Sequence, residues 1–87
     1  MQLLEEIIGE ENGKQARCTL FVGGGGYFEG VKAVGDFSDE KIVLFFSRAS
    51  AEIEGVDLSI GKYCDGDLRL RGKIRTVRFL GKEGAPI

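Results

Sequence analysis

The stretch from Ala51 to Phe79 constrains the fold more than any other part of the chain, because apolar and polar residues alternate along it in three short runs. Leu58 and Ile60 are separated by Ser59, and between positions 68 and 75 apolar residues are interleaved with basic ones. A period of two is typical of a strand with one buried and one exposed face. Glycines and aspartates divide the stretch into strand-sized pieces. The pattern therefore predicts a compact antiparallel sheet.

Along the whole chain, the same pattern predicts an all-β fold, a small antiparallel sandwich or roll of about six strands with a short N-terminal helix. The predicted strands span residues 17–22, 28–34, 41–47, 51–56, 58–63 and 67–74. Beyond the last of them, the apolar positions change from even numbers to odd ones at Val77 and Phe79. Such a change of phase requires a bulge or a break near Arg75 and Thr76.

The first residues carry a helical pattern instead. Leu3, Leu4, Ile7 and Ile8 follow the spacing of one helical face. A helix this short is not stable alone, so the segment docks on the sheet, docks on another subunit, or frays. We divide the chain into an N-terminal helical segment and linker over 1–15, a β domain over 16–80 and a flexible tail over 81–87.

The run KIVLFFS at 41–47 is the most apolar in the chain and is typical of a central strand. Because four apolar residues are consecutive there, both faces of this strand need to be covered. One face meets the core, and the other needs the N-terminal segment, a second sheet or another subunit. We predict self-association, as a homodimer or higher assembly, through Val43 and Phe45. The predicted core consists of inward-facing positions of the strands: Leu20, Val22, Phe28, Val31, Ile42, Leu44, Phe46, Ile53, Leu58, Ile60, Leu68, Leu70, Ile74 and Val77.

Four consecutive glycines, Gly23 to Gly26, join the first two predicted strands. A glycine-rich loop cradles phosphate when it leads into a helix N-terminus. Here it leads into the strand-like segment from Tyr27 to Val31, and no Lys-Ser or Lys-Thr pair follows. We therefore interpret the run as a flexible connection.

Two segments of the chain resemble each other. Glu29-Gly30-Val31 matches Glu54-Gly55-Val56, and after one extra residue the likeness continues in five pairs: Gly35 with Gly61, Phe37 with Tyr63, Asp39 with Asp65, Ile42 with Leu68, and Leu44 with Leu70. Each unit would comprise a strand, a short strand, a turn and a strand. Two copies with a gap also arise by chance in a chain punctuated by glycine, so the sequence leaves both readings open.

The composition of the chain argues against most kinds of catalytic site and metal site. The chain has 87 residues, enough for one domain, and it has no His, which excludes imidazole catalysis and the usual zinc sites. Cys18 and Cys64 are too few for a disulfide scaffold, and no His is present to activate either as a nucleophile. Asp57, Asp65 and Asp67 have a spacing seen in cation sites, but turn chemistry explains the last two without a metal. We predict no enzyme activity, no cofactor and no metal.

No apolar run approaches the roughly 20 residues that span a membrane. The start, MQLLEEII, is acidic where a signal peptide is basic. We expect a cytoplasmic protein with reduced thiols and no membrane span.

Charge is unevenly distributed, since residues 1–40 carry −5 and residues 41–87 carry +3. Four basic residues alternate along one predicted strand and would share one face of it as a basic stripe: Arg69, Arg71, Lys73 and Arg75. Three interpretations stay open. The stripe is a solvated face that pairs with Glu52 and Glu54 of a neighbouring strand, a site for a protein partner, or the surface of a small nucleic-acid-binding β module. Binders of single strands also place aromatic residues on the basic face, and neither tyrosine belongs to the stripe, so nucleic acid is the least favoured.

Several motifs follow one another between Thr19 and Phe79: Tyr27-Phe28-Glu29-Gly30-Val31, Ile53-Glu54-Gly55, Leu58-x-Ile60 and the alternation from Asp67 to Ile74. In this order the chain resembles the YabP/YqfC family of sporulation proteins. The resemblance implies a small, mostly β, non-enzymatic protein of endospore-forming bacteria that takes part in building the spore envelope. It implies partners among copies of the chain itself and other sporulation proteins, and it assigns no catalytic or ligand residue.

Overall fold

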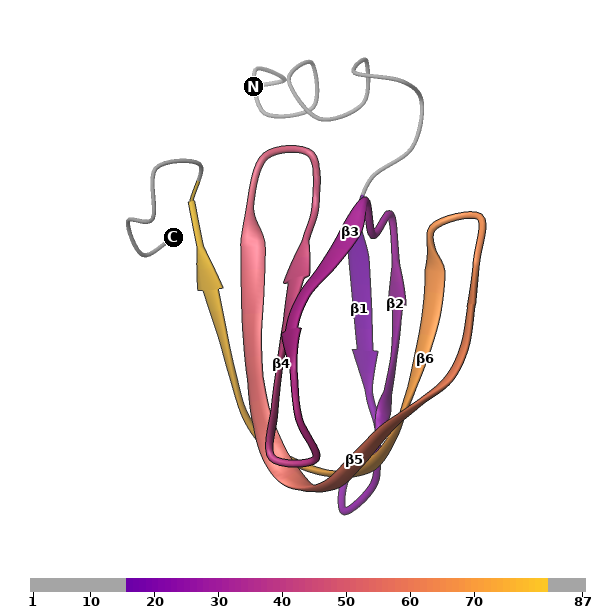
Figure 1. Ribbon diagram of the computed structural model, residues 1–87, viewed down its shortest axis with the longest axis vertical. Helices are drawn as coiled ribbons and strands as arrows, with labels where there is room; N and C mark the ends of the chain where they lie inside the picture. Colours follow the sequence, from indigo (N-terminus) through magenta and orange to yellow (C-terminus); the bar gives the residue numbers. More distant parts are fainter. Residues whose placement is uncertain (1–15, 82–87) are drawn as a thin grey trace.

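The computed structural model describes residues 16–81, which contain six strands and no helix. The strands are β1 (Arg17–Leu20), β2 (Gly26–Glu29), β3 (Ala33–Phe37), β4 (Lys41–Phe45), β5 (Ser50–Cys64) and β6 (Asp67–Leu80). They form one antiparallel sheet in the order β1-β2-β6-β5-β4-β3 (Figure 1). The predicted all-β antiparallel fold is thus confirmed, whereas the predicted N-terminal helix lies outside the described residues. Within these residues, no helix has the length and apolar character needed to cross a membrane.

The sheet bends across its two longest strands and so forms two facing layers (Figure 1). We call one the β2 layer; it comprises β1, β2, residues 67–71 of β6 and residues 59–64 of β5. The other, the β4 layer, comprises β3, β4, residues 50–54 of β5 and residues 74–80 of β6. The long hairpin of β5 and β6 therefore runs through both layers, and the fold is a sandwich made by rolling a single sheet.

Glycine permits the bend in this hairpin. A Cβ atom on Gly55 would overlap the carbonyl oxygen of Lys73, and one on Gly72 would overlap that of Asp57. Gly72 also has a φ of +112°, which side-chain-bearing residues rarely adopt. Asp57, with a φ of 55°, is the other left-handed residue at the bend. The two strands cross at the bend with their backbones too close for a side chain.

At the bend, some backbone N–H groups do not take part in the hydrogen bonds between β5 and β6. The carbonyl groups of two neighbouring loops accept hydrogen bonds from them. The N–H groups of Gly55 and Leu58 donate to the carbonyls of Glu40 and Asp39, in the turn between β3 and β4. The N–H of Ile74 donates to the carbonyl of Gly24, in the loop between β1 and β2. These bonds satisfy N–H groups that would otherwise lack partners. The glycine run predicted as a flexible connection is instead a hydrogen-bonded turn.

The two layers have the same strand register, which confirms the internal repeat. In the β2 layer Phe28 pairs with Leu68, and in the β4 layer Ile53 pairs with Ile42. The offset is 25 residues for the first strand of each unit and 26 for the later ones, as in the sequence. The hairpins of the two units match under the same offset. Val34 pairs with Leu44, and the equivalent Ile60 pairs with Leu70. Phe37 pairs with Ile42, and the equivalent Tyr63 pairs with Leu68. The first strand of each unit pairs with the last strand of the other, so the repeats are interlocked.

The inward faces of the two layers form one core. Its fully buried members come from both repeats: Phe28, Val31, Ile42, Leu44, Ala51, Ile53, Leu58, Leu68 and Leu70. Eight of these nine were predicted, and Ala51 was not. Phe46, Ile60, Ile74 and Val77 pack against the core while only partly buried. The prediction was wrong for Leu20 and Val22, which are 47% and 106% exposed, because β1 ends at Leu20 and the chain turns away from the core.

Strand boundaries differ from the prediction at two places where the structural role of a glycine was misread. The predicted strand 28–34 is two strands, because the chain leaves the sheet at Gly30 with a φ of 87° and re-enters it in the other layer. The predicted strands 51–56 and 58–63 are one strand, β5, that bends without ending. The predicted change of phase is confirmed: Ile74 pairs with Gly55 and Thr76 with Glu54, so Arg75 is the bulged residue.

Candidate functional site

The outer face of the β4 layer carries an apolar patch formed by Val43, Phe45 and Gly35, on β4 and β3. Phe45 is 43% exposed and Val43 is half-buried, whereas the intervening Leu44 is fully buried. A Cβ on Gly35 would lie 2.7 Å from Cε2 of Phe45, so the aromatic ring lies across the glycine.

The outer face of the β2 layer has the same construction with basic side chains. Arg69 and Arg71 occupy the positions on β6 that Val43 and Phe45 occupy on β4, 26 residues earlier. Gly61 is the counterpart of Gly35, and a Cβ there would lie 2.8 Å from Nε of Arg71. Two members of the predicted basic stripe, Arg69 and Arg71, are therefore at positions equivalent to the predicted self-association pair, Val43 and Phe45, so these positions are apolar in one layer and cationic in the other.

The basic stripe is divided by the bend. Arg69 and Arg71 lie on the outer face of the β2 layer, whereas Lys73 and Arg75 follow Gly72 and lie at the bend. All four are exposed. All four were predicted to share one face of a strand, but the bend separates Lys73 and Arg75 from Arg69 and Arg71.

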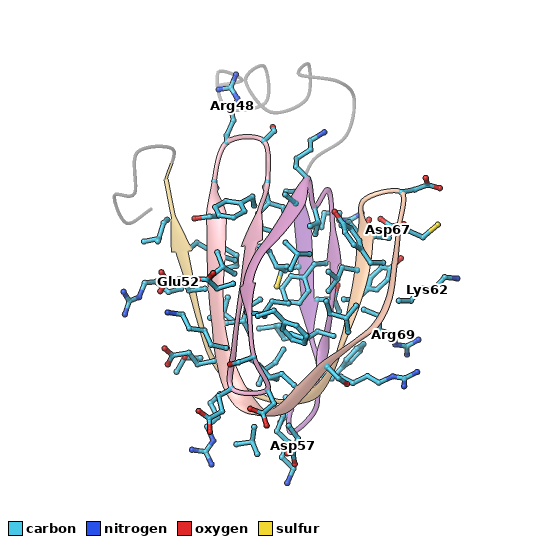
Figure 2. All side chains as sticks on the ribbon, viewed as in Figure 1. Arg48, Glu52, Asp57, Lys62, Asp67 and Arg69 are labelled. Carbon is cyan, nitrogen blue, oxygen red and sulfur yellow. The ribbon has the colours of Figure 1, made fainter. Side chains whose placement is uncertain are left out.

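The carboxylates predicted to face the stripe lie elsewhere. Glu52 pairs with Arg78, with 4.0 Å between Oε1 and the guanidinium, and Glu54 accepts a hydrogen bond of 3.4 Å from the hydroxyl of Thr76. Both carboxylates lie on the outer face of the β4 layer, since Ile53 between them is buried. Glu52 lies on the opposite side of the molecule from Arg69 (Figure 2). The interpretation of the stripe as the ion-pair partner of Glu52 and Glu54 is wrong.

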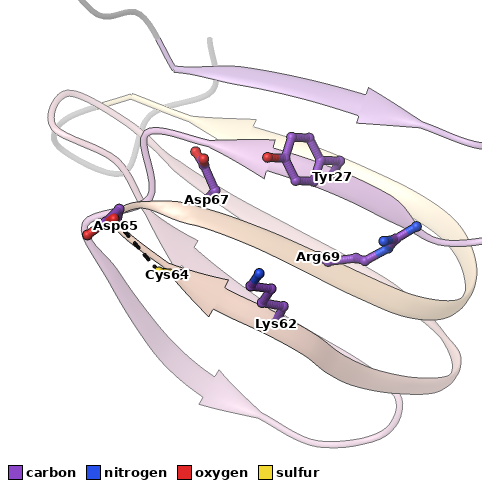
Figure 3. Close-up of a pocket in the computed structure, with 6 residues that line it drawn as sticks. All are labelled: Tyr27, Lys62, Cys64, Asp65, Asp67 and Arg69. Carbon is purple, nitrogen blue, oxygen red and sulfur yellow. Dashed lines mark hydrogen bonds between the residues drawn. The ribbon is translucent and has the colours of Figure 1, made fainter.

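A shallow hollow of about 380 Å³ lies on the β2 layer, beside its turn (Figure 3). It is lined by two bases, two acids, a tyrosine and a thiol: Lys62, Arg69, Asp65, Asp67, Tyr27 and Cys64. Tyr27 lies opposite Arg69 in the β2–β6 pairing, so an aromatic ring does lie beside the basic stripe. Desolvation and the carboxylate of Asp67 raise the pKa of Tyr27. Because its acids and bases balance, the hollow does not favour a polyanion.

The cysteines and aspartates are dispersed. Partial burial raises the pKa of the Cys18 thiol, and Cys64 makes a weak contact of 3.7 Å from Sγ to Oδ2 of Asp65. Both cysteines are free. Asp57 lies at the bend, away from Asp65 and Asp67 at the β5–β6 turn (Figure 2). Among residues 16–81, no three His, Cys, Asp or Glu side chains gather in a group that could hold a metal ion.

The model of the YabP family matches residues 16–85. The chain belongs to the YabP family. Membership of this family suggests a sporulation-related protein, and the YabP family is not a known enzyme family. Among curated proteins and among solved structures, no match was found.

The match begins at Ala16 and covers all six strands, including the bend in β5 and β6. It therefore covers both interlocked repeats as one unit. The equivalence of the apolar patch and the Arg69–Arg71 pair could have been inferred from the sequence, because the 26-residue offset links Val43 to Arg69 and Phe45 to Arg71. The position of Tyr27 beside Arg69 could not have been inferred, because it depends on which strand of one repeat pairs with which strand of the other.

Proposed function

We propose that this YabP family member is a non-enzymatic sporulation protein that acts by protein–protein assembly in spore envelope formation, in the cytoplasm of the mother cell or the forming spore. Family membership supports the sporulation role. The apolar patch on the β4 layer supports assembly, and the exposed ring of Phe45 is the observation that carries the proposal. Copies of this chain and other sporulation proteins are the proposed partners.

The patch has two properties of an association surface. An aromatic ring that lies across a glycine presents a large, rigid apolar area, and aromatic side chains lose little conformational entropy on binding. In addition, β3 is the last strand of the sheet, so one edge of it has no strand partner within residues 16–81. Such an edge can pair with a strand from another chain. A partner that pairs with β3 would cover the ring of Phe45 at the same time.

Replacement of Phe45 by Asp tests this surface. Burial of a phenylalanine contributes about 1.5–3 kcal/mol, so the variant should self-associate about one to two orders of magnitude more weakly. Sedimentation velocity or light scattering over a range of concentrations measures the change. Thr19→Asp is the matched control, because Thr19 is an exposed residue of β1 in the other layer. Unchanged mass in Phe45→Asp, or a wild-type protein that is monomeric at every concentration, overturns assembly through this patch.

The cellular role is tested by deleting the gene in its sporulating host. We expect fewer heat-resistant spores with normal vegetative growth. Complementation with Thr19→Asp should restore the spore count, whereas Phe45→Asp, produced at an equal level, should not. A deletion strain with normal spores and no paralogue to replace the protein contradicts the proposal.

A further inference from the structure

The loop between β1 and β2 presents the most exposed apolar side chains of the described residues. Phe21 is 52% exposed and Val22 is 106% exposed, and Leu20 beside them is 47% exposed. This loop, drawn in purple, projects beyond the bend at the lower end of the molecule (Figure 1). We call residues 20–22 the apolar tip. Single exposed apolar residues are common, but three in succession at a projecting turn are not needed for folding.

The tip is held in a defined shape. The N–H of Phe21 donates to the carbonyl of Gly25, and the N–H of Gly24 donates to the carbonyl of Phe21, both at 2.9 Å. Gly23 has a φ of +74°, and a Cβ on Gly25 would overlap the carbonyl oxygen of Leu70. The glycines therefore close a tight turn against β6. In this turn Phe21 and Val22 point outward, since both are more than half exposed.

Two exposed bases lie beside the tip. The carbonyl of Gly24 accepts a hydrogen bond of 2.9 Å from the N–H of Ile74, which places the loop beside the segment of β6 that carries Lys73 and Arg75. Both side chains are exposed. The acids at this end belong to neighbouring segments: Asp57 in β5, whose carbonyl oxygen lies against Gly72, and Asp39 and Glu40 in the β3–β4 turn. The strand that holds the loop contributes only positive charge beside the apolar tip.

We propose that the apolar tip is a membrane-contact site, with Phe21 and Val22 inserting into the interface of a lipid bilayer and Lys73 and Arg75 contacting anionic headgroups. Interfacial binding of this kind scales with inserted apolar area and with attraction to acidic lipids. The two bases on the strand that holds the loop favour an anionic bilayer surface over an uncharged one. The inference is independent of the proposed assembly, because the tip and the patch around Phe45 use different residues and lie on different parts of the fold.

Co-sedimentation of the full chain with large vesicles tests the proposal. Vesicles of phosphatidylcholine alone are compared with vesicles in which a third of the lipid is phosphatidylglycerol, at low and at high salt. The wild-type protein should bind the anionic vesicles, and salt should weaken the binding. Phe21→Ser combined with Val22→Ser should lose most of it, with thermal unfolding confirming that the sheet is intact. Absence of binding to anionic vesicles at low salt overturns the proposal.

A matched pair of charge variants separates a local contact from general electrostatic attraction. Lys73→Glu with Arg75→Glu should weaken vesicle binding by at least about fivefold per base removed. Lys32→Glu with Lys62→Glu changes net charge equally but away from the tip, so it should have a much smaller effect. Equal losses from both pairs overturn the assignment of the site to this loop. If the Phe21 and Val22 changes alter self-association and leave vesicle binding as it was, the tip binds protein and not lipid.

Discussion

The two layers share a backbone plan and differ on their outer faces. Ile42 and Leu44 of the β4 layer correspond to Leu68 and Leu70 of the β2 layer, and all four are buried. On the outside, Phe45 over Gly35 corresponds to Arg71 over Gly61. The inward residues and the glycines fix the register, because a slip of one residue would expose the core face. The outward residues are under no such constraint, so binding functions belong where the layers differ.

The largest effect is expected from equivalent core truncations. Leu44→Ala and Leu70→Ala should each cost about 2–5 kcal/mol of unfolding free energy, because each leaves a cavity in the shared core. If the layers contribute equally, the two costs should agree within about 1 kcal/mol. Urea denaturation measures both, with Leu20→Ala as a control that should cost much less, since Leu20 is 47% exposed. A large cost in only one layer would show that the layers are equivalent in register but not in energy.

Much of this fold could be predicted from local pattern. Alternation identified the sheet, and the change of apolar parity located the bulge at Arg75. The repeat emerged from three residues, Glu-Gly-Val, and a spacing. Local pattern could not show which structural role each glycine has. Gly55 allows a continuous strand to bend, whereas Gly30 marks the exit from one layer to the other, and the two look alike in sequence. The positive φ of Gly30 and the carbonyl oxygen of Lys73 against Gly55 distinguish them, and neither can be read from local pattern.

The candidate surfaces were predictable to a similar degree. Consecutive apolar residues from Val43 to Phe46 indicated a second face that needs to be covered, by the N-terminal segment, a second sheet or another subunit. Among residues 16–81, the ring of Phe45 on that face is 43% exposed. The basic stripe was assigned to one flat face because its residues alternate, but Gly72 and the bulge at Arg75 divide it. The apolar tip was missed because Leu20 and Val22 have the parity of core residues. Their exposure results from the tight turn that the following glycines form.

An exchange of residues between the outer faces should have an intermediate effect. Phe45→Arg makes the β4 layer resemble the β2 layer and should weaken self-association without loss of stability, since the ring is exposed. Arg71→Phe should do the reverse, because it creates a second apolar patch over Gly61 and so favours larger assemblies. Analytical ultracentrifugation of both single variants and of the double exchange measures the effect. If Arg71→Phe leaves the mass distribution unchanged, apolar character alone does not make this position an association site.

The smallest effect concerns the two hairpin turns, which lie at equivalent positions but differ in backbone conformation, since neither Asp39 nor Glu40 has the positive φ of Asp65 and Gly66. Asp65 and Gly66 both have positive φ, as a two-residue turn of type I′ requires. The equivalent turn in the β4 layer relies on Ser38, whose hydroxyl accepts hydrogen bonds of 3.2 Å from the N–H groups of Glu40 and Lys41. Ser38→Ala should therefore cost about 0.5–1.5 kcal/mol.

The counterpart of Ser38 is Cys64, whose side chain is exposed and makes only the weak contact with Asp65. Because the backbone conformation of Asp65 and Gly66 already closes that turn, Cys64→Ala should cost at most about 0.5 kcal/mol, the range of ordinary surface changes. Thermal or urea unfolding of the two variants side by side measures the difference. Equal costs would mean that the Ser38 hydroxyl does not hold its turn, and that the backbone of β3 and β4 sets the hairpin without help from the side chain.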